Sequence, residues 1–123
     1  VSPDRKWIAY TSNESGQNEL YAVPSDRRAP SRVSNAGGRE SVWRRDGSEL
    51  FFIDANDWIS AVSVKDGSFG PPARLFHIEP GVGHTRLDPI FGNTYDVSPD
   101  GQRFLVNQAV NGITDLQMNV IVR

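Results

Sequence analysis

At residues 97–106 the sequence reads Val97-Ser98-Pro99-Asp100-Gly101-Gln102-Arg103-Phe104-Leu105-Val106, a tight-turn motif followed by an apolar segment of strand length. Proline presets φ for the second position of a type I turn. Serine and aspartate side chains bond back to nearby backbone groups, and glycine accepts the left-handed φ that closes a bulged hairpin. The stretch therefore predicts a hairpin corner, with Pro99, Asp100 and Gly101 in the turn.

The same pattern occurs at two earlier places in the chain. One copy is Val1-Ser2-Pro3-Asp4-Arg5-Lys6-Trp7-Ile8-Ala9-Tyr10, and the other is Trp43-Arg44-Arg45-Asp46-Gly47-Ser48-Glu49-Leu50-Phe51-Phe52. The aligned aspartates are 42 and 54 residues apart. Because a four-stranded propeller blade repeats about every 40–45 residues, the spacing predicts three successive blades with an insertion before the third.

The copies differ at the turn itself. Arg5 stands where the other copies have Gly47 and Gly101, and Arg45 replaces the proline. We expect Arg5 to adopt a positive φ with mild strain. The aspartates recur because the turn needs them, so we assign them to structure and not to catalysis. The turn residues of the first two copies are Pro3, Asp4, Asp46 and Gly47.

The remaining sequence indicates an all-β chain of one domain. It has 123 residues, 37% of them hydrophobic, and its 11 glycines and 8 prolines interrupt any helical period. Short segments rich in branched and aromatic residues recur instead. The clearest is 58–64, where period-two alternation puts apolar groups on both faces and predicts a strand packed between neighbours.

Composition also excludes several functional classes. The net charge is −2, so bulk electrostatics does not favour nucleic acid or an anionic membrane. No apolar run approaches the roughly 18 residues that span a bilayer, so we expect no membrane insertion by this segment. The absence of cysteine excludes disulfides and thiolate metal sites and leaves the compartment, periplasmic or cytoplasmic, undetermined.

The repeats resemble the WD-like propeller repeats of the TolB type, on the basis of the Ser-Pro-Asp-Gly turn, the strand after it, and the later strand Glu19-Leu20-Tyr21-Ala22-Val23. Residues 95–107 resemble more particularly the last blade of propellers found C-terminal to some bacterial serine/threonine protein kinases. The resemblance implies a β-propeller fragment of about three four-stranded antiparallel blades. The expected boundaries are blade one at 1–34, blade two at 35–79, an inserted loop at 80–92 and blade three at 93–123.

On this template both terminal blades are incomplete, because the first lacks most of its innermost strand and the last lacks its outermost strand. Closed propellers contain about four to eight blades, and an open stack exposes apolar faces. We therefore expect either self-association or a protein partner that closes the propeller, or a fragment excised from a longer one. The start at Val1 without methionine agrees with a processed or excised segment.

Loop lengths suggest where a ligand would bind. The longer, more polar connections share one end of the propeller, and binding residues concentrate on such loops. The predicted ligand contacts are Arg39, His84, Arg86 and Asp88; the alternative for the 79–89 loop is a disordered insertion. His77, His84 and Glu79 match no defined metal site, and 54–57 reads as a tight hairpin and not as a calcium loop. We expect no metal and no cofactor.

We expect the main role of the tryptophans to be packing in the core or at an interface. Trp43 aligns with Val1 and Val97, which predicts packing between blades. Trp7 aligns with the polar Glu49 and Arg103, so it should be partly exposed or covered by a neighbouring chain. A ligand platform at Trp7 or Trp58 is the alternative.

Two functional classes follow from the resemblance. The first is a non-catalytic binding or sensory module that recognises a protein or small ligand and reports to an attached domain. The second is an accessory gating propeller of a prolyl-oligopeptidase-like hydrolase. In either case the segment itself is expected not to be an enzyme.

Overall fold

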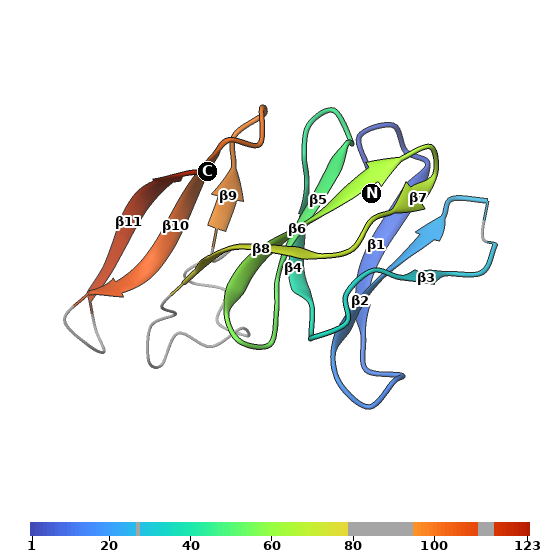
Figure 1. The fold of residues 1–123 in the computed structure, drawn as a ribbon, viewed down its shortest axis with the longest axis horizontal. Coiled ribbons are helices and arrows are strands. Elements are labelled where there is room, and N and C mark those ends of the chain that lie inside the picture. Colours follow the sequence, from blue (N-terminus) through green and yellow to red (C-terminus); the bar gives the residue numbers. More distant parts are fainter. Residues whose placement is uncertain (27, 79–94, 111–114) are drawn as a thin grey trace.

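The computed structural model describes residues 1–26, 28–78, 95–110 and 115–123, and this part of the chain forms β-strands and no α-helix (Figure 1). Three antiparallel sheets follow one another along the long axis of the molecule. The first contains β1 (Trp7–Ser12), β2 (Glu19–Pro24) and β3 (Ser31–Arg32). The second contains β4 (Arg39–Trp43), β5 (Glu49–Ile53), β6 (Trp58–Lys65), β7 (Ser68–Phe69) and β8 (Ala73–His77). The third contains β9 (Tyr95–Val97), β10 (Arg103–Val110) and β11 (Asp115–Val122). The all-β prediction is confirmed.

The outer edge of the second sheet contains one strand that the sequence did not predict. Both β7 and β8 pair antiparallel with β6, at Val64–Lys65 and at Trp58–Ala61 respectively. The edge is split because Gly70, Pro71 and Pro72 lie between the two pieces, and proline has no N–H to donate to the ladder.

Alternation along β5 gives the second sheet two apolar faces. Leu50 and Phe52 pack with residues of the first sheet, including Leu20 and Ala22. Phe51 and Ile53 instead pack with residues of the third sheet, in a cluster that contains Tyr95, Phe104 and Val106. The two clusters hold the three sheets face to face, and Trp43 packs against the first of them, as predicted.

Within the described ranges, no helix is long and apolar enough to cross a membrane.

Candidate functional site

Three turns of the same design lie at one end of the sheets, at the upper side of Figure 1. In the first, the Asp4 carboxylate accepts hydrogen bonds from Ser2 Oγ at 2.6 Å and from the Lys6 backbone N–H at 2.9 Å. Ser2 Oγ in turn accepts from the Trp7 N–H at 3.0 Å. Side chains thus cap backbone groups that the sharp turn leaves without strand partners.

The third turn repeats these bonds, whereas the second differs because Arg44 stands where Ser2 and Ser98 stand. Asp100 accepts from Ser98 Oγ at 2.6 Å and from the Gln102 N–H at 3.0 Å, and Asp46 accepts from both the N–H and the Oγ of Ser48. The fourth turn residue has a left-handed φ in every copy: 63° at Arg5, 77° at Gly47 and 71° at Gly101. The positive φ expected at Arg5 is therefore observed, and Pro3 and Pro99 occupy the second turn position.

Hydrogen bonding keeps the turn carboxylates ionised. The Ser2 hydroxyl and the Lys6 N–H lower the pKa of Asp4 below its usual value. The Ser48 side chain and backbone do the same to the pKa of Asp46, and Ser98 and the Gln102 N–H to that of Asp100. A carboxylate with a lowered pKa is a poor proton donor or acceptor at neutral pH, so these groups act as turn caps and as fixed negative charges.

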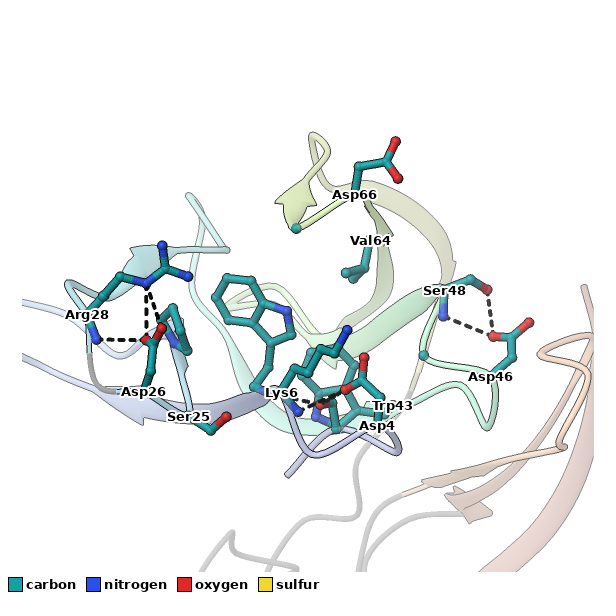
Figure 2. A pocket seen from close by; sticks show the side chains of 15 residues that line it. Asp4, Lys6, Ser25, Asp26, Arg28, Trp43, Asp46, Ser48, Val64 and Asp66 are labelled. Carbon is teal, nitrogen blue, oxygen red and sulfur yellow. Dashed lines mark hydrogen bonds and ion pairs between the residues drawn. The ribbon is translucent and has the colours of Figure 1, made fainter.

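The first two turns border a hollow of about 610 Å³ between the first and second sheets (Figure 2). Its walls come from both sheets, from the turns that precede β1 and β5 and from those that follow β2 and β6. The lining residues are Ser2, Asp4, Lys6, Trp7, Pro24, Ser25, Asp26, Arg28, Trp43, Asp46, Gly47, Ser48, Val64, Asp66 and Gly67.

The apolar part of the hollow is aromatic. Trp7 and Trp43 both line it and are both half-buried. The Phe69 ring supports them, because its centroid lies 4.9 Å from that of Trp7, edge to face, and 6.4 Å from that of Trp43. Phe69 belongs to β7, so the unpredicted short strand supplies a ring that packs against both tryptophans.

The polar part of the hollow is mainly acidic. Four aspartates line it, against the two cations Lys6 and Arg28. Arg28 is already paired with Asp26 at 2.9 Å, and Asp46 lies 3.4 Å from Arg44, which is outside the lining. Asp66 has a left-handed φ of 52° and an exposed side chain, and no described residue hydrogen-bonds or ion-pairs with it.

A ligand platform at Trp7 was one alternative predicted from the sequence, but the hollow itself was not predicted. The available signal was a break in the repeat, where Trp7 occupies the position that is Glu49 and Arg103 in the other copies. A large aromatic group at a polar position marks either an interface or a ligand contact.

The one described member of the predicted ligand set lies at the opposite end of the sheets. Arg39 donates to the Asp54 carbonyl at 3.1 Å and to the Asp57 carboxylate at 3.0 Å, and it lines a smaller hollow of about 160 Å³. His84, Arg86 and Asp88, and the inserted loop at 80–92 to which they belong, lie outside the described residues. A ligand site at that end stays a prediction.

The hairpin predicted at 54–57 is observed. The Asp54 carboxylate accepts from the backbone N–H groups of Asn56 and Trp58 at 2.9 and 3.0 Å, and its other oxygen pairs with Arg74 at 2.8 Å. No cluster of metal-ligating side chains occurs among the residues that the structure describes.

A buried carboxylate anchors the first sheet to the connection that follows it. Glu19 is fully buried and accepts from the Ser34 hydroxyl, from Arg32 at 2.9 Å and from the Gly37 N–H at 3.1 Å. Burial alone would raise the pKa of Glu19, but these hydrogen bonds and one from Gln17 outweigh it and lower the pKa. Glu19 is therefore a structural charge, satisfied on every side.

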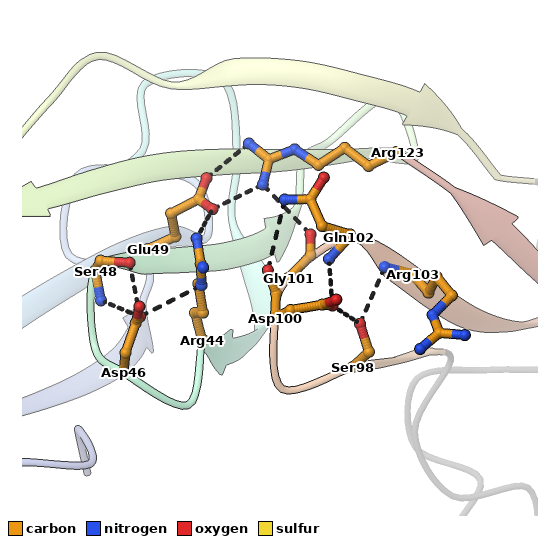
Figure 3. A network of polar contacts seen from close by, with 10 residues as sticks. All are labelled: Arg44, Asp46, Ser48, Glu49, Ser98, Asp100, Gly101, Gln102, Arg103 and Arg123. Atoms are coloured by element: carbon orange, nitrogen blue, oxygen red, sulfur yellow. Dashed lines mark hydrogen bonds and ion pairs between the residues drawn. The ribbon is translucent and has the colours of Figure 1, made fainter.

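A second ionic network joins the second and third sheets next to the turns (Figure 3). The two terminal nitrogens of Arg123 contact the two Glu49 carboxylate oxygens, each at 2.7 Å. Arg44 contacts the same carboxylate at 3.3 Å. The network fixes the end of β11 to the start of β5.

Comparison with known proteins bears on the fold. No protein-family model matches the sequence, and no curated protein is significantly similar to it. Among solved structures, TolB from Acinetobacter baumannii is similar, with a TM-score of 0.66 and 21% sequence identity over 99% of this chain. The chain spans 28% of the length of that TolB chain. The chain therefore has the fold of a TolB-like β-propeller segment.

Proposed function

We propose that this chain is a non-catalytic propeller module that binds a peptide in the 610 Å³ hollow, with a basic side chain of the peptide over Trp7 and Trp43. The observation that carries the proposal is the combination of two half-buried tryptophans with a predominantly acidic rim. Indole faces attract cations through their quadrupole, and carboxylates around them add to that attraction.

The charges around the hollow favour a cation over an anion. Asp26 pairs with Arg28, and Asp46 lies 3.4 Å from Arg44 outside the lining, so Asp4 and Asp66 remain against the single cation Lys6. A cation over an indole gains about 0.5–2 kcal/mol, and each exposed ion pair about 0.2–1 kcal/mol. With one such ion pair, a basic side chain should therefore bind roughly 3- to 150-fold more tightly than a neutral one of equal length.

The same contacts support a binding role without catalysis. Asp4 and Asp46 are committed to turn bonds that lower their pKa values, so neither is suited to move protons at neutral pH. A binding role also agrees with the resemblance to propellers attached to bacterial serine/threonine protein kinases, in which recognition would be reported to the attached domain. A gating role beside a hydrolase stays a prediction.

Titration of the ¹⁵N-labelled chain with blocked pentapeptides tests this proposal. The peptides differ only in a central lysine, arginine, norleucine or glutamate, flanked by glycine and serine. We expect the lysine and arginine peptides to shift the indole N–H signals of Trp7 and Trp43. The Trp58 signal serves as the internal control, because Trp58 packs against His77 and Arg74, away from the hollow.

The variant Asp66→Asn removes one rim charge and keeps the backbone, since asparagine tolerates a left-handed φ. It should weaken binding of the lysine peptide, whereas Glu14→Gln, the same charge change on an exposed residue at the other end of the sheets, should not. Equal binding of the norleucine and lysine peptides would contradict the proposal. So would equal effects of the two variants.

A further inference from the structure

A second hollow, of about 230 Å³, lies between the second sheet and the connection that joins it to the first sheet. It shares no lining residue with the 610 Å³ hollow. Its walls come from the segment between β3 and β4 and from the parts of the second sheet around β5, β6 and β8. Because a water molecule occupies about 30 Å³ in the liquid, the hollow has room for a ligand of several heavy atoms.

One wall of this hollow contains a buried hydroxyl without a partner. Ser60 lies in β6 and is only 2% exposed, yet its side chain makes no hydrogen bond to any residue that the structure describes. Its neighbours in the sheet, Phe52 in β5 and Arg74 in β8, line the same hollow. A buried hydroxyl without a hydrogen bond costs free energy. Since Ser60 itself lines the hollow, a molecule bound there can supply the missing hydrogen bond.

Arg74 is held beside Ser60 with part of its guanidinium group unused. The two residues are cross-strand partners in β6 and β8 (Figure 1), and the register of the strands shifts next to this pair. The Nε of Arg74 donates to an Asp54 carboxylate oxygen at 2.8 Å, and its guanidinium carbon lies 5.3 Å from the centre of the Trp58 ring. Its two terminal nitrogens make no hydrogen bond within the described ranges. Asp54 and Trp58 thus orient the guanidinium group and leave its terminal nitrogens available.

The polar groups that remain available around the hollow are mainly donors. The Asp54 carboxylate is already matched, since one oxygen accepts from two backbone N–H groups and the other from Arg74. Asn35 also lines the hollow, and its amide makes no hydrogen bond to a described residue. The Phe52 ring and Pro72 supply apolar surface. A ligand must therefore offer acceptors, and a carboxylate fits best because its two oxygens match the paired N–H groups of a guanidinium.

We propose that this hollow binds a carboxylate, either of a small aliphatic acid or of an acidic side chain. The two terminal nitrogens of Arg74 donate to the two carboxylate oxygens, and the Ser60 hydroxyl donates to one of them. The aliphatic carbons of the ligand pack on Phe52. The site goes beyond the peptide-binding role proposed above and does not depend on it, because it uses different residues and a ligand of opposite charge.

Titration of the ¹⁵N-labelled chain with sodium butyrate, butyramide and sodium chloride tests the proposal. The indole N–H of Trp58 is the reporter, because Arg74 lies over its ring. We expect butyrate to shift this signal saturably below about 10 mM, and butyramide to bind at least about fivefold more weakly, because hydrogen bonds to a charged acceptor are stronger. Sodium chloride should produce no saturable shift. Butyrate should leave the Trp7 signal in place, whereas the lysine peptide should move Trp7 and not Trp58, so failure of one site is distinguishable from failure of the other.

Substitutions at two positions separate the hydroxyl from the guanidinium group. Ser60→Ala removes the hydroxyl without removing any hydrogen bond of the described residues, and it should weaken butyrate binding about three- to tenfold. Ser63→Ala, at an exposed position of the same strand, is the matched control and should leave binding unchanged. Arg74→Lys keeps the charge but loses the paired nitrogens, and it should weaken binding at least about tenfold, with the Ser60 backbone N–H as the reporter. Circular dichroism checks that each variant is folded.

The blocked pentapeptide with a central glutamate, compared with the same peptide containing glutamine, distinguishes the two sources of the carboxylate. A saturable Trp58 shift with butyrate alone assigns the site to a free acid, and a shift with the glutamate peptide assigns it to an acidic side chain. No saturable shift with either carboxylate up to about 10 mM would overturn the proposal. Equal binding of butyrate and butyramide, or unchanged butyrate binding in Ser60→Ala, would overturn it as well.

Discussion

Arg123 donates hydrogen bonds to Glu49 from both terminal guanidinium nitrogens, and each nitrogen lies 2.7 Å from a carboxylate oxygen. The two residues are 74 positions apart in the sequence. This ion pair connects the third sheet to the second, next to the turns that contain Asp46 and Asp100. Both side chains are largely sheltered from solvent, with 14% of Glu49 and 27% of Arg123 exposed. Because the geometry is bidentate and partly buried, the pair is expected to be stronger than a typical surface ion pair.

Replacing Glu49 by glutamine should therefore loosen the third sheet. The substitution removes the charge that Arg123 and Arg44 share and leaves both guanidinium groups poorly matched. We expect the free energy of unfolding to fall by about 1–2 kcal/mol. Urea denaturation measures it, and Glu14→Gln at an exposed site should change it by less than about 0.5 kcal/mol. A loss equal to that of the control would contradict the role of the pair.

Stability should fall at acid pH for the same reason. The hydrogen bond and charge of Arg123 hold the pKa of Glu49 below its ordinary value of 4.5, and the hydrogen bonds to Glu19 lower its pKa as well. Groups with a lowered folded-state pKa stabilise the fold above their unfolded-state pKa, and that stability is lost as pH falls through the folded-state value. We expect the loss below about pH 5, with a shallower slope in Glu49→Gln. An identical slope in the variant would contradict this assignment.

An alkaline limit is expected from Tyr95. Burial, reinforced by the nearby charges of Glu40 and Asp96, raises the pKa of the Tyr95 hydroxyl well above its usual value of 10.0. A raised folded-state pKa means that stability is present below the unfolded-state pKa and is lost as pH rises beyond it. In Tyr95→Phe the decline above about pH 10 should become smaller, and an unchanged decline would contradict this assignment.

Tyr95→Phe also carries a cost at neutral pH. The hydroxyl donates a 2.6 Å hydrogen bond to the Glu40 carbonyl, in the strand of the neighbouring sheet. Loss of this bond should destabilise the fold by about 1 kcal/mol. Thermal unfolding at pH 7 measures the change, and an unchanged midpoint would show that the bond does not form.

The turns offer a test in two directions. Gly47→Ala forces a side chain onto a φ of 77° and should cost about 1 kcal/mol, although the space around the added methyl group is open. Arg5→Gly removes a side chain from the equivalent position and should relieve strain. The free energy of unfolding should therefore rise by up to about 1 kcal/mol. Opposite signs in urea denaturation are expected, and destabilisation by Arg5→Gly would contradict the shared turn geometry.

Local sequence carried enough information to predict most of the strands and the hairpin turns, but not β7. The Ser-Pro-Asp-Gly turn is built from bonds within six residues, and the alternation along 58–64 is visible in the residues themselves. These features depend on the chain's own backbone and side chains and not on distant partners.

The candidate site could not be predicted in the same way. The hollow exists only where turns from two sheets meet, and the ring that supports Trp7 and Trp43 comes from β7, a strand of two residues with no periodic signal. The partners of Glu19 are similarly remote, since Ser34 and Gly37 lie 15 and 18 positions further along the chain.

The hollow depends on the stacking of separate sheets, and proton–proton nuclear Overhauser effects test this stacking directly. Two contacts are expected between rings of neighbouring sheets: Trp7 with Phe69, at 4.9 Å between centroids, and Phe51 with Phe104, at 5.2 Å. We expect cross-peaks for both pairs and none between Phe52 and Phe104, because Phe52 lies on the face of the second sheet that points away from Phe104. Missing cross-peaks for the first two pairs, or a strong one between Phe52 and Phe104, would contradict this stacking.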